Sequence, residues 1–134
     1  MDKVAKTDDQ WREQLDPERF HVLREAGTEP RFTGAYTYSK ADGVYRCGAC
    51  GADLFSSESK YDSGSGWPSF TEPAVAEAVE LREDNGLMMR RTEVVCARCG
   101  SHLGHVFPDG PGPTGERYCI NSLALDLDER EPES

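Results

Sequence analysis

Cys47-Gly48-Ala49-Cys50 and Cys96-Ala97-Arg98-Cys99 are two copies of one short motif, and a glycine follows each of them. Two Cys-x-x-Cys pairs supply four thiolates at the spacing found in tetrahedral structural zinc sites. Residues 51–95 separate the pairs, an interval longer than that of a small zinc finger. We therefore predict that one zinc ion ties together two distant parts of a larger domain.

The paired cysteines have two other interpretations, a redox dithiol and disulfides. A redox dithiol of the thioredoxin type is typical of a single pair beside a strand–helix junction, not of two matched pairs. Four protein thiolates also leave no open coordination position for water, which argues against a zinc hydrolase. The sequence therefore favours structural Zn2+ bound by four ligands: Cys47, Cys50, Cys96 and Cys99.

Length and charge limit the remaining possibilities. The chain has 134 residues, enough for one domain with a substantial core. Its 15 Lys and Arg against 25 Asp and Glu give a net charge of -10, which disfavours nucleic acid or an anionic membrane as a partner. The first residues lack the apolar run of a secretory signal, and no stretch approaches the length of a membrane span. Thiols kept for a metal suit a reducing compartment, so we expect a cytoplasmic protein.

The predicted fold is mainly β, with two short helices at its start. Thr7 and Gln10 form a possible capping box for a helix over residues 7–15. Asp16 and Pro17 supply the N-cap and first-turn proline of a second helix, which ends near residues 26–27. The following short apolar runs are separated by turn residues and predict an antiparallel body. The predicted strands cover residues 35–39, 44–47, 79–82, 87–95, 103–107, 116–121 and 124–127.

Two further features concern the ends of these elements. Asn85-Gly86 favours a type I′ hairpin, because both central residues of that turn need positive φ. Residues 128–134 are charged and lack an apolar anchor, so we expect a frayed tail after a single domain over residues 1–127.

The fifth cysteine, Cys119, stands apart in Arg117-Tyr118-Cys119-Ile120-Asn121. The period of a β-strand places Arg117, Cys119 and Asn121 on one face, with the two apolar residues directed into the core. A cation near the thiol would raise its thiolate fraction, since a free cysteine has a pKa of about 8.5. The alternative is that Cys119 is a small buried apolar residue, as most unpaired cysteines are.

His102 and His105 directly follow the second cysteine pair. Imidazole titrates near neutral pH, so both are candidate proton carriers. Residues three apart fall on opposite faces of a regular strand, and we therefore expect one histidine to face the site while the other supports it or packs. Zinc ligation is a weaker interpretation, because four cysteines already complete a tetrahedral site.

A glycine-rich loop, Gly64-Ser65-Gly66-Trp67-Pro68-Ser69-Phe70, carries an indole next to a proline. Trp67 is a candidate for the wall of a binding pocket. A tryptophan that anchors the loop or fills the core is an equally common interpretation.

Together these motifs resemble the methionine-R-sulfoxide reductase B family, from about Gln10 to Leu127. Besides the cysteine pairs, four stretches carry the resemblance: Gly27-Thr28-Glu29-Pro30 with Phe32-Thr33-Gly34, the Trp67 loop, His102-Leu103-Gly104-His105-Val106-Phe107-Pro108-Asp109-Gly110, and residues 113–122. The resemblance implies two antiparallel β-sheets that lean together as a β-tent, with short N-terminal helices. It further implies a structural zinc site of four cysteines away from the active site, and a monomer.

The resemblance also implies roles for individual residues. Cys119 would be the nucleophile that attacks the sulfoxide sulfur and becomes a sulfenic acid. Trp67 would receive the methyl group of the substrate, while His105 and Asn121 would hold water or the sulfoxide oxygen. The surrounding residues of the implied site are His102, Arg117 and Phe107. The chain would thus reduce methionine-R-sulfoxide; the residues leave open whether the protein-bound or the free form is preferred.

One position departs from many family members, which have a second, resolving cysteine where this chain has Ser65. A serine cannot form a disulfide with Cys119, so we expect an external thiol, thioredoxin or a small dithiol, to reduce the sulfenic acid. The alternative is that Ser65 is a replacement introduced by engineering. A different class of function is a non-catalytic zinc module that binds a ligand or peptide side chain in an aromatic pocket.

Overall fold

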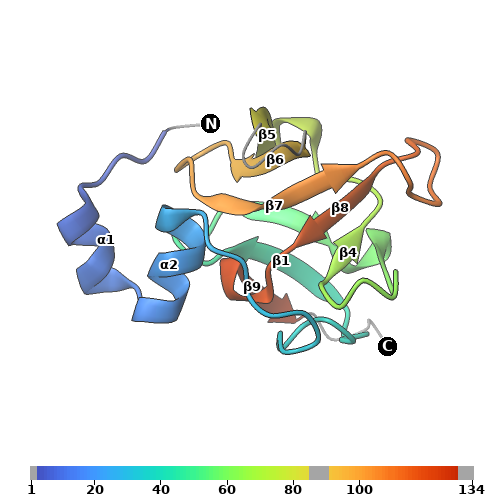
Figure 1. Cartoon of the computed structure of the whole chain (residues 1–134), viewed down its shortest axis with the longest axis horizontal. Helices are drawn as coiled ribbons and strands as arrows, with labels where there is room; N and C mark the ends of the chain where they lie inside the picture. Colours follow the sequence, from blue (N-terminus) through green and yellow to red (C-terminus); the bar gives the residue numbers. More distant parts are fainter. Residues whose placement is uncertain (1–2, 85–90, 130–134) are drawn as a thin grey trace.

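The computed structural model describes residues 3–84 and 91–129. Within these ranges it has two helices, three short 3-10 turns and nine strands (Figure 1). The helices are α1 (Asp8–Gln14) and α2 (Pro17–Glu25). The strands are β1 (Gly43–Cys47), β2 (Asp53–Ser56), β3 (Lys60–Tyr61), β4 (Ser69–Phe70), β5 (Val79–Asp84), β6 (Arg91–Cys96), β7 (His102–Phe107), β8 (Arg117–Ile120) and β9 (Leu125–Glu129).

The helices begin where their caps predict. The Gln10 N–H donates to Thr7 Oγ1 at 3.2 Å and the Thr7 N–H donates to Gln10 Oε1 at 2.9 Å, which completes the capping box of α1. Asp16 accepts from the Arg19 N–H at 2.9 Å and Pro17 opens α2. These bonds satisfy amide donors that the first turn of a helix otherwise leaves without partners.

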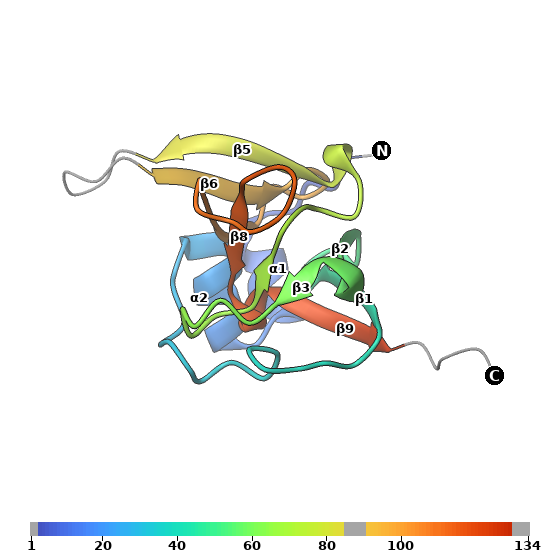
Figure 2. The ribbon, with the colours of Figure 1, turned by 90° about the vertical axis from the view of Figure 1, so that its right-hand side faces the viewer.

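The described strands form two antiparallel sheets. One has the order β2-β1-β9 and the other the order β3-β4-β8-β7-β6-β5. Figure 2 shows β5 and β6 on one side of the molecule and β1 and β9 on the other, and Figure 1 shows both helices at one end. The predicted class is therefore confirmed: mainly β, with two antiparallel sheets and two short N-terminal helices.

Aromatic side chains join the two sheets. The rings of Phe55 on β2 and Phe70 on β4 stack at 4.4 Å between centroids, and both side chains are fully buried. Tyr45 on β1 meets Phe70 edge-on at 5.2 Å, and Tyr118 on β8 lies 5.9 Å from Phe55. Fully burying one such side chain contributes about 1.5–3 kcal/mol. This aromatic cluster fixes the orientation of β8, the strand that carries Cys119.

Several predicted boundaries are wrong. Residues 35–38 form turns rather than a strand, with N–H···O bonds from Thr37 to Gly34 at 3.4 Å and from Ser39 to Tyr36 at 3.2 Å. The strand expected at 87–95 is described from Arg91 and continues to Cys96, while the hairpin turn expected at residues 85–86 lies outside the described residues. The last strand, β9, extends two residues into the expected tail, because Asp128 and Glu129 pair with β1.

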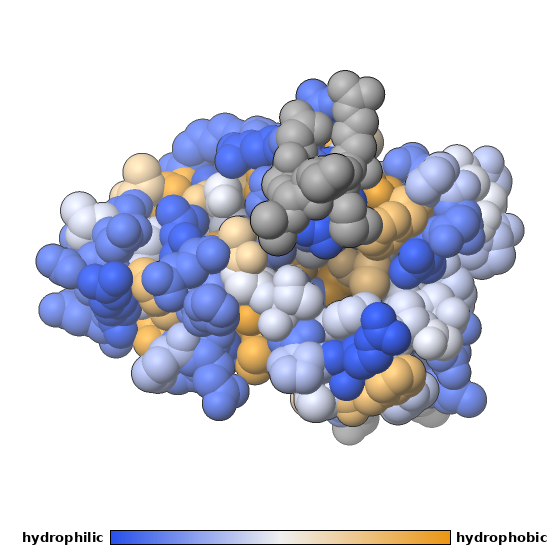
Figure 3. Space-filling view, in the orientation of Figure 1, coloured by the Kyte–Doolittle hydropathy of each residue, from blue (hydrophilic) through white to orange (hydrophobic). Residues whose placement is uncertain are grey.

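Hydrophilic and hydrophobic residues are distributed differently over the helical end and the β-rich side of the molecule (Figure 3). Figure 3 shows mainly hydrophilic residues over the end formed by the helices, and hydrophobic surface between hydrophilic groups on the β-rich side. Among residues 3–84 and 91–129, no helix is long and apolar enough to cross a membrane.

Candidate active site and metal centre

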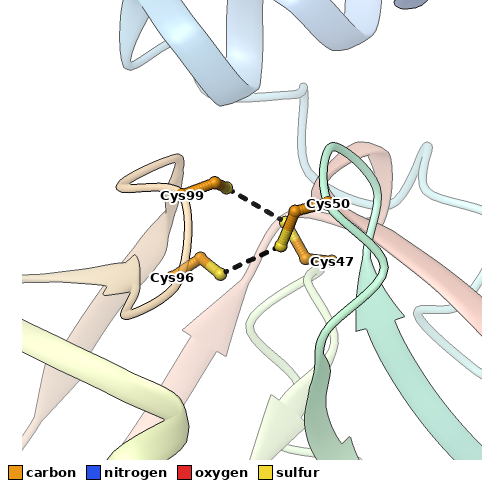
Figure 4. Close-up of side chains that lie close together, drawn as sticks. All are labelled: Cys47, Cys50, Cys96 and Cys99. Carbon is orange, nitrogen blue, oxygen red and sulfur yellow. Dashed lines mark hydrogen bonds between the residues drawn. The ribbon is translucent and has the colours of Figure 1, made fainter. Parts of the chain in front are cut away.

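The cysteine pairs lie where the two sheets meet. Cys47 is the last residue of β1 and Cys50 lies in the turn before β2; likewise Cys96 is the last residue of β6 and Cys99 lies in the turn before β7. Figure 4 shows the four side chains converging from these two turns. Their sulfur atoms lie within 4.8 Å of one another. The two pairs come from different parts of the domain, as predicted, since one lies at an end of a strand of each sheet.

Each cysteine pair forms a tight turn that the following glycine closes. The Gly51 N–H donates to the Cys47 carbonyl at 2.9 Å, and the Gly100 N–H donates to the Cys96 carbonyl at 2.8 Å. Both glycines have positive φ, 78° and 75°, a conformation that glycine adopts without steric cost. The glycine after each pair thus allows the chain to turn back so that both thiols face the same point.

The sulfur separations fit a tetrahedral ion. The Sγ atoms of Cys47 and Cys99 are 3.7 Å apart, and those of Cys50 and Cys96 are 3.6 Å apart. A tetrahedral ion with Zn–S bonds of about 2.3 Å separates its sulfur ligands by about 3.8 Å. Four thiols without disulfide bonds at these distances therefore form a candidate metal centre.

A second site is a cavity of about 260 Å³ beside β7 and β8. It is lined by Cys119, Trp67, His105 and Asn121, which the family resemblance implied for one site. Its lining residues are Thr28, Arg31, Ser65, Trp67, Arg91, Gly104, His105, Phe107, Arg117, Cys119 and Asn121. The four clustered cysteines are not among the described residues that line it.

The alternation predicted for β8 is confirmed. Tyr118 and Ile120 are buried, with 6% and 0% of their surfaces exposed, whereas Arg117 and Cys119 are partly exposed and line the cavity. Cys119 is paired with His105 of β7 on one side and with Ser69 of β4 on the other. The nucleophile candidate thus lies on a central strand whose neighbours hold its backbone.

Burial and local donors act on the Cys119 thiol in opposite directions. Burial raises its pKa above the ordinary cysteine value and is the largest influence. The Ser65 hydroxyl, 3.9 Å from Cys119 Sγ, and the guanidinium of Arg117 oppose this shift. Arg117 is itself fixed by two bonds to the Asp109 carboxylate, at 2.9 and 3.3 Å, and lies 4.6 Å over the Phe107 ring.

The two histidines lie side by side, so the expectation of opposite faces is wrong, although His105 lines the cavity while His102 is buried. Their ring centroids are 5.4 Å apart in an edge-to-face arrangement. A β-bulge explains the difference: Val94 of β6 pairs with Gly104 and Val95 pairs with His102, which leaves Leu103 as an extra residue. One inserted residue resets the alternation of side chains along β7.

Each histidine contacts a carboxylate of the β5–β6 hairpin. His105 Nε2 lies 3.0 Å from Asp84 Oδ2, and His102 Nδ1 lies 2.7 Å from Glu93 Oε2. Burial lowers the pKa of His105, against the hydrogen bond to Asp84, which raises it. The contact with Asp84 holds the His105 imidazole in one orientation. His102 is buried, and the edge-to-face contact of its ring with that of His105 makes it a candidate support for His105.

Glu29 connects Trp67 and Asn121, although sequence reasoning gave it no role. The Trp67 indole Nε1–H donates to the Glu29 carbonyl at 2.9 Å, and the Glu29 N–H donates to Asn121 Oδ1 at 3.0 Å. Asn121 Nδ2 in turn donates to the Leu103 carbonyl at 3.0 Å. The segment after α2 therefore fixes both the indole and the amide at the cavity.

Comparison with known proteins agrees with this geometry. The SelR domain model matches residues 15–129. The peptide methionine sulfoxide reductase MsrB of Thiobacillus denitrificans is 62% identical over 120 residues, covering 90% of this chain and 91% of that protein. The chain belongs to the MsrB family of peptide methionine sulfoxide reductases.

Two other MsrB proteins match over nearly the whole chain. The MsrB of Methanosarcina mazei is 54% identical over 131 residues, which is 98% of this chain and 94% of the relative. The MsrB of Pseudomonas aeruginosa strain PAO1 is 56% identical over 131 residues, 98% of this chain and 99% of the relative. The region that matches the family, residues 15–129, contains both the cysteine cluster and the residues that line the cavity.

The cavity of this MsrB family member includes two arginines that sequence reasoning missed. Arg31 comes from the segment after α2, and Arg91 from the start of β6. Neither is near Cys119 in the sequence, and no local pattern marks them. Their positions depend on how the segment after α2 and the β5–β6 hairpin pack against β7 and β8.

Proposed function

We propose that this chain reduces methionine-R-sulfoxide in peptides and proteins, with Cys119 as the nucleophile. The supporting observation is that Cys119, Trp67, His105 and Asn121 line one cavity. A soft sulfur nucleophile, a nitrogen base, an amide donor and an aromatic wall are the groups this reduction needs. The activity for which the MsrB relatives are named supports the same reaction class.

The chemical step transfers oxygen from the substrate to Cys119. The Sγ thiolate attacks the sulfoxide sulfur while the sulfoxide oxygen takes a proton; the S–O bond of the substrate breaks and an S–O bond to Cys119 forms. The substrate sulfur gains two electrons and leaves as methionine. Cys119 loses two electrons and becomes a sulfenic acid, which carries the proton on its oxygen.

The cavity residues have distinct roles in this proposal. Trp67 and Phe107 provide apolar surface for the methyl group of the substrate. His105 and Asn121 bind the sulfoxide oxygen, directly or through water, and His105 passes the proton to it. Arg117 raises the thiolate fraction of Cys119, and His102 keeps His105 in place. Because the methyl group and the oxygen of the sulfoxide each have a fixed position in the cavity, only one configuration at the chiral sulfur fits, and this configuration is the R epimer.

An external thiol completes the cycle. Ser65 lies beside Cys119 and cannot form a disulfide, and the other four cysteines are clustered together. A thiolate of thioredoxin or a small dithiol attacks the sulfenic sulfur, which releases water and forms a mixed disulfide. The second thiol of the same reductant then displaces Cys119 and leaves an oxidised dithiol. These reduced cysteines also suit a cytoplasmic location.

We also propose that Cys47, Cys50, Cys96 and Cys99 hold a structural Zn2+. The sulfur separations support this donor set for zinc. When bound, the ion would cross-link the two sheets and supply no open coordination position. Catalysis would then depend on zinc only through the integrity of the fold.

A single-turnover assay tests the proposed function. The zinc-loaded protein is mixed with R or S sulfoxide peptides without reductant, and both the methionine released and the intact protein mass are measured. We expect about one equivalent from the R epimer alone, with one oxygen added at Cys119. A folded sample that releases no methionine from either epimer would instead support the non-catalytic binding module.

A further inference from the structure

Arg31 lies at the cavity and against its tryptophan. Its guanidinium carbon is 5.2 Å from the centroid of the Trp67 ring, and its side chain lines the same cavity as Cys119. The Phe32 N–H donates to the Gly66 carbonyl at 2.7 Å, which holds the Arg31 segment against the Trp67 loop. The backbone thus holds Arg31 beside the Trp67 loop, and its guanidinium lies over the indole.

The three arginines of the cavity differ in their partners. Arg117 is bound by both oxygens of Asp109, and Arg91 lies 3.4 Å from Asp84 Oδ2. For Arg31, residues 3–84 and 91–129 provide the Trp67 ring but no carboxylate within ion-pair distance. A cation–π contact with a ring does not use the five N–H groups of a guanidinium as donors to an anion. Arg31 therefore has donors ready for an anion.

The charge around Arg31 contrasts with that of the whole chain. The protein has a net charge of -10, yet three arginines converge on this cavity. A planar guanidinium binds a carboxylate through two parallel hydrogen bonds, and these charge-assisted bonds are among the strongest in proteins. Because stacking on Trp67 already restricts the Arg31 side chain, less conformational entropy is lost when a ligand binds.

We propose that Arg31 is a specificity-determining residue, which binds a carboxylate that the substrate carries next to its methionine sulfoxide. The carboxylate has two sources with the same chemistry, the α-carboxylate of a C-terminal or free methionine sulfoxide and the side chain of a neighbouring Asp or Glu. This inference rests on the proposed function, since it assumes that the sulfoxide lies between Trp67 and Cys119.

Matched substrates measure this preference. N-acetyl-methionine-R-sulfoxide with a free carboxylate is compared with its neutral N-methylamide, and peptides with Glu before or after the sulfoxide are compared with their Gln counterparts. The quantity measured is the ratio of kcat/KM between each charged substrate and its neutral partner. It is determined for the parent chain, Arg31→Gln, Arg31→Lys and Arg12→Gln. Arg12, an exposed residue of α1, controls for the loss of one positive charge.

In the parent chain we expect the kcat/KM ratio of charged to neutral substrate to exceed one for at least one source of carboxylate. In Arg31→Gln this ratio should fall by roughly three- to tenfold. Arg31→Lys should retain part of the preference, Arg12→Gln should retain all of it, and added salt should weaken it. The peptide pairs show which carboxylate is bound. Equal losses on charged and neutral substrates would overturn the proposal and leave Arg31 as a support for Trp67.

A binding measurement separates this proposal from the proposed function. N-acetyl-methionine and its N-methylamide, which need no turnover, are titrated into the same variants and followed by NMR. A preference for the carboxylate form that disappears in Arg31→Gln supports the inference even if no sulfoxide is reduced. Equal affinity for both forms in parent and variant, together with a kcat/KM ratio of one, rejects it while leaving the reductase proposal intact.

Discussion

The Ser65 hydroxyl oxygen lies 3.9 Å from Cys119 Sγ, although the two residues are far apart in the sequence. Ser65 also accepts a hydrogen bond from the Ser63 hydroxyl at 2.8 Å, so the loop presents it in a fixed orientation. The position that faces the proposed nucleophile therefore has an oxygen in place of a second sulfur. In the proposed cycle, this contact leaves the reduction of the Cys119 sulfenic acid to an external thiol.

Ser65→Cys should convert the one-cysteine cycle into an internal one. After one turnover without reductant, the new thiol should attack the Cys119 sulfenic acid, release water and form a disulfide. Intact mass then shows loss of two hydrogens rather than gain of an oxygen. Ser63→Cys is the matched control, since the Ser63 side chain contacts Ser65 and Ser69 instead of Cys119. A Ser65→Cys protein that carries only oxidised Cys119 contradicts the geometry.

Cys96→Ser should abolish stoichiometric zinc and unfold the domain. Metal binding contributes directly to folding in structural zinc sites, by about 10–16 kcal/mol in zinc-finger peptides. We expect one zinc per parent chain, little in the variant, and loss of its cooperative thermal transition. Cys119→Ser should keep both zinc and melting temperature, because Cys119 lies outside the cluster. A Cys96→Ser protein that melts like the parent would rule out a structural ion.

The reactivity of Cys119 should increase with pH well above neutrality. Burial raises the pKa of its thiol, so the thiolate forms at higher pH than in a free cysteine, for which the pKa is about 8.5. Below the folded-state pKa, alkylation by iodoacetamide should become about tenfold faster per pH unit. Mass spectrometry of the Cys119 peptide gives the midpoint.

Arg117→Gln should move that midpoint further up, because it removes a cation that favours the thiolate. Arg12→Gln should leave it unchanged. A midpoint in the parent below that of free cysteine would show that Arg117 and Ser65 outweigh burial, contrary to our expectation. The single-turnover rate should follow the same curve if the thiolate is the attacking species.

Asn121→Asp should destabilise the protein at pH 7 by about 1–3 kcal/mol. The replacement keeps an acceptor for the Glu29 N–H but places a carboxylate oxygen against the Leu103 carbonyl, to which the amide of Asn121 donates at 3.0 Å. Burial opposes ionisation of the new carboxyl, so its folded-state pKa is raised. Urea unfolding of variant and parent gives the difference in stability.

The pH dependence of the Asn121→Asp destabilisation distinguishes a buried carboxylate from a loss of packing. With a raised folded-state pKa, the destabilisation is fully present above that pKa and decreases as pH falls through it, because the protonated carboxyl can donate to Leu103. The stability difference from the parent should therefore be smaller at pH 4 than at pH 7. A difference that does not vary with pH would assign the loss to packing instead.

Local sequence signals predicted the elements that depend on adjacent residues. Thr7 and Asp16 cap their helices as expected, and the alternation of Arg117 to Ile120 gives two buried and two cavity-facing residues. The strand predicted over residues 35–39 failed because its backbone bonds close turns within the loop. Strands β3 and β4 have two residues each and exist through their partners, so their sequences carry too little pattern to identify them.

The sequence by itself determined the candidate metal centre and the chemical types of residue that line the cavity. Two Cys-x-x-Cys-Gly segments contain their own turn geometry, and Cys119 with its strand neighbours has a fixed alternation. Only the tertiary structure decided which side chains lie in contact at the cavity. The bulge at Leu103 brought His102 and His105 together, and packing of the segment after α2 placed Arg31 over Trp67. Short-range periodicity follows from backbone sterics, whereas these contacts depend on strand register and loop packing between residues far apart in the chain.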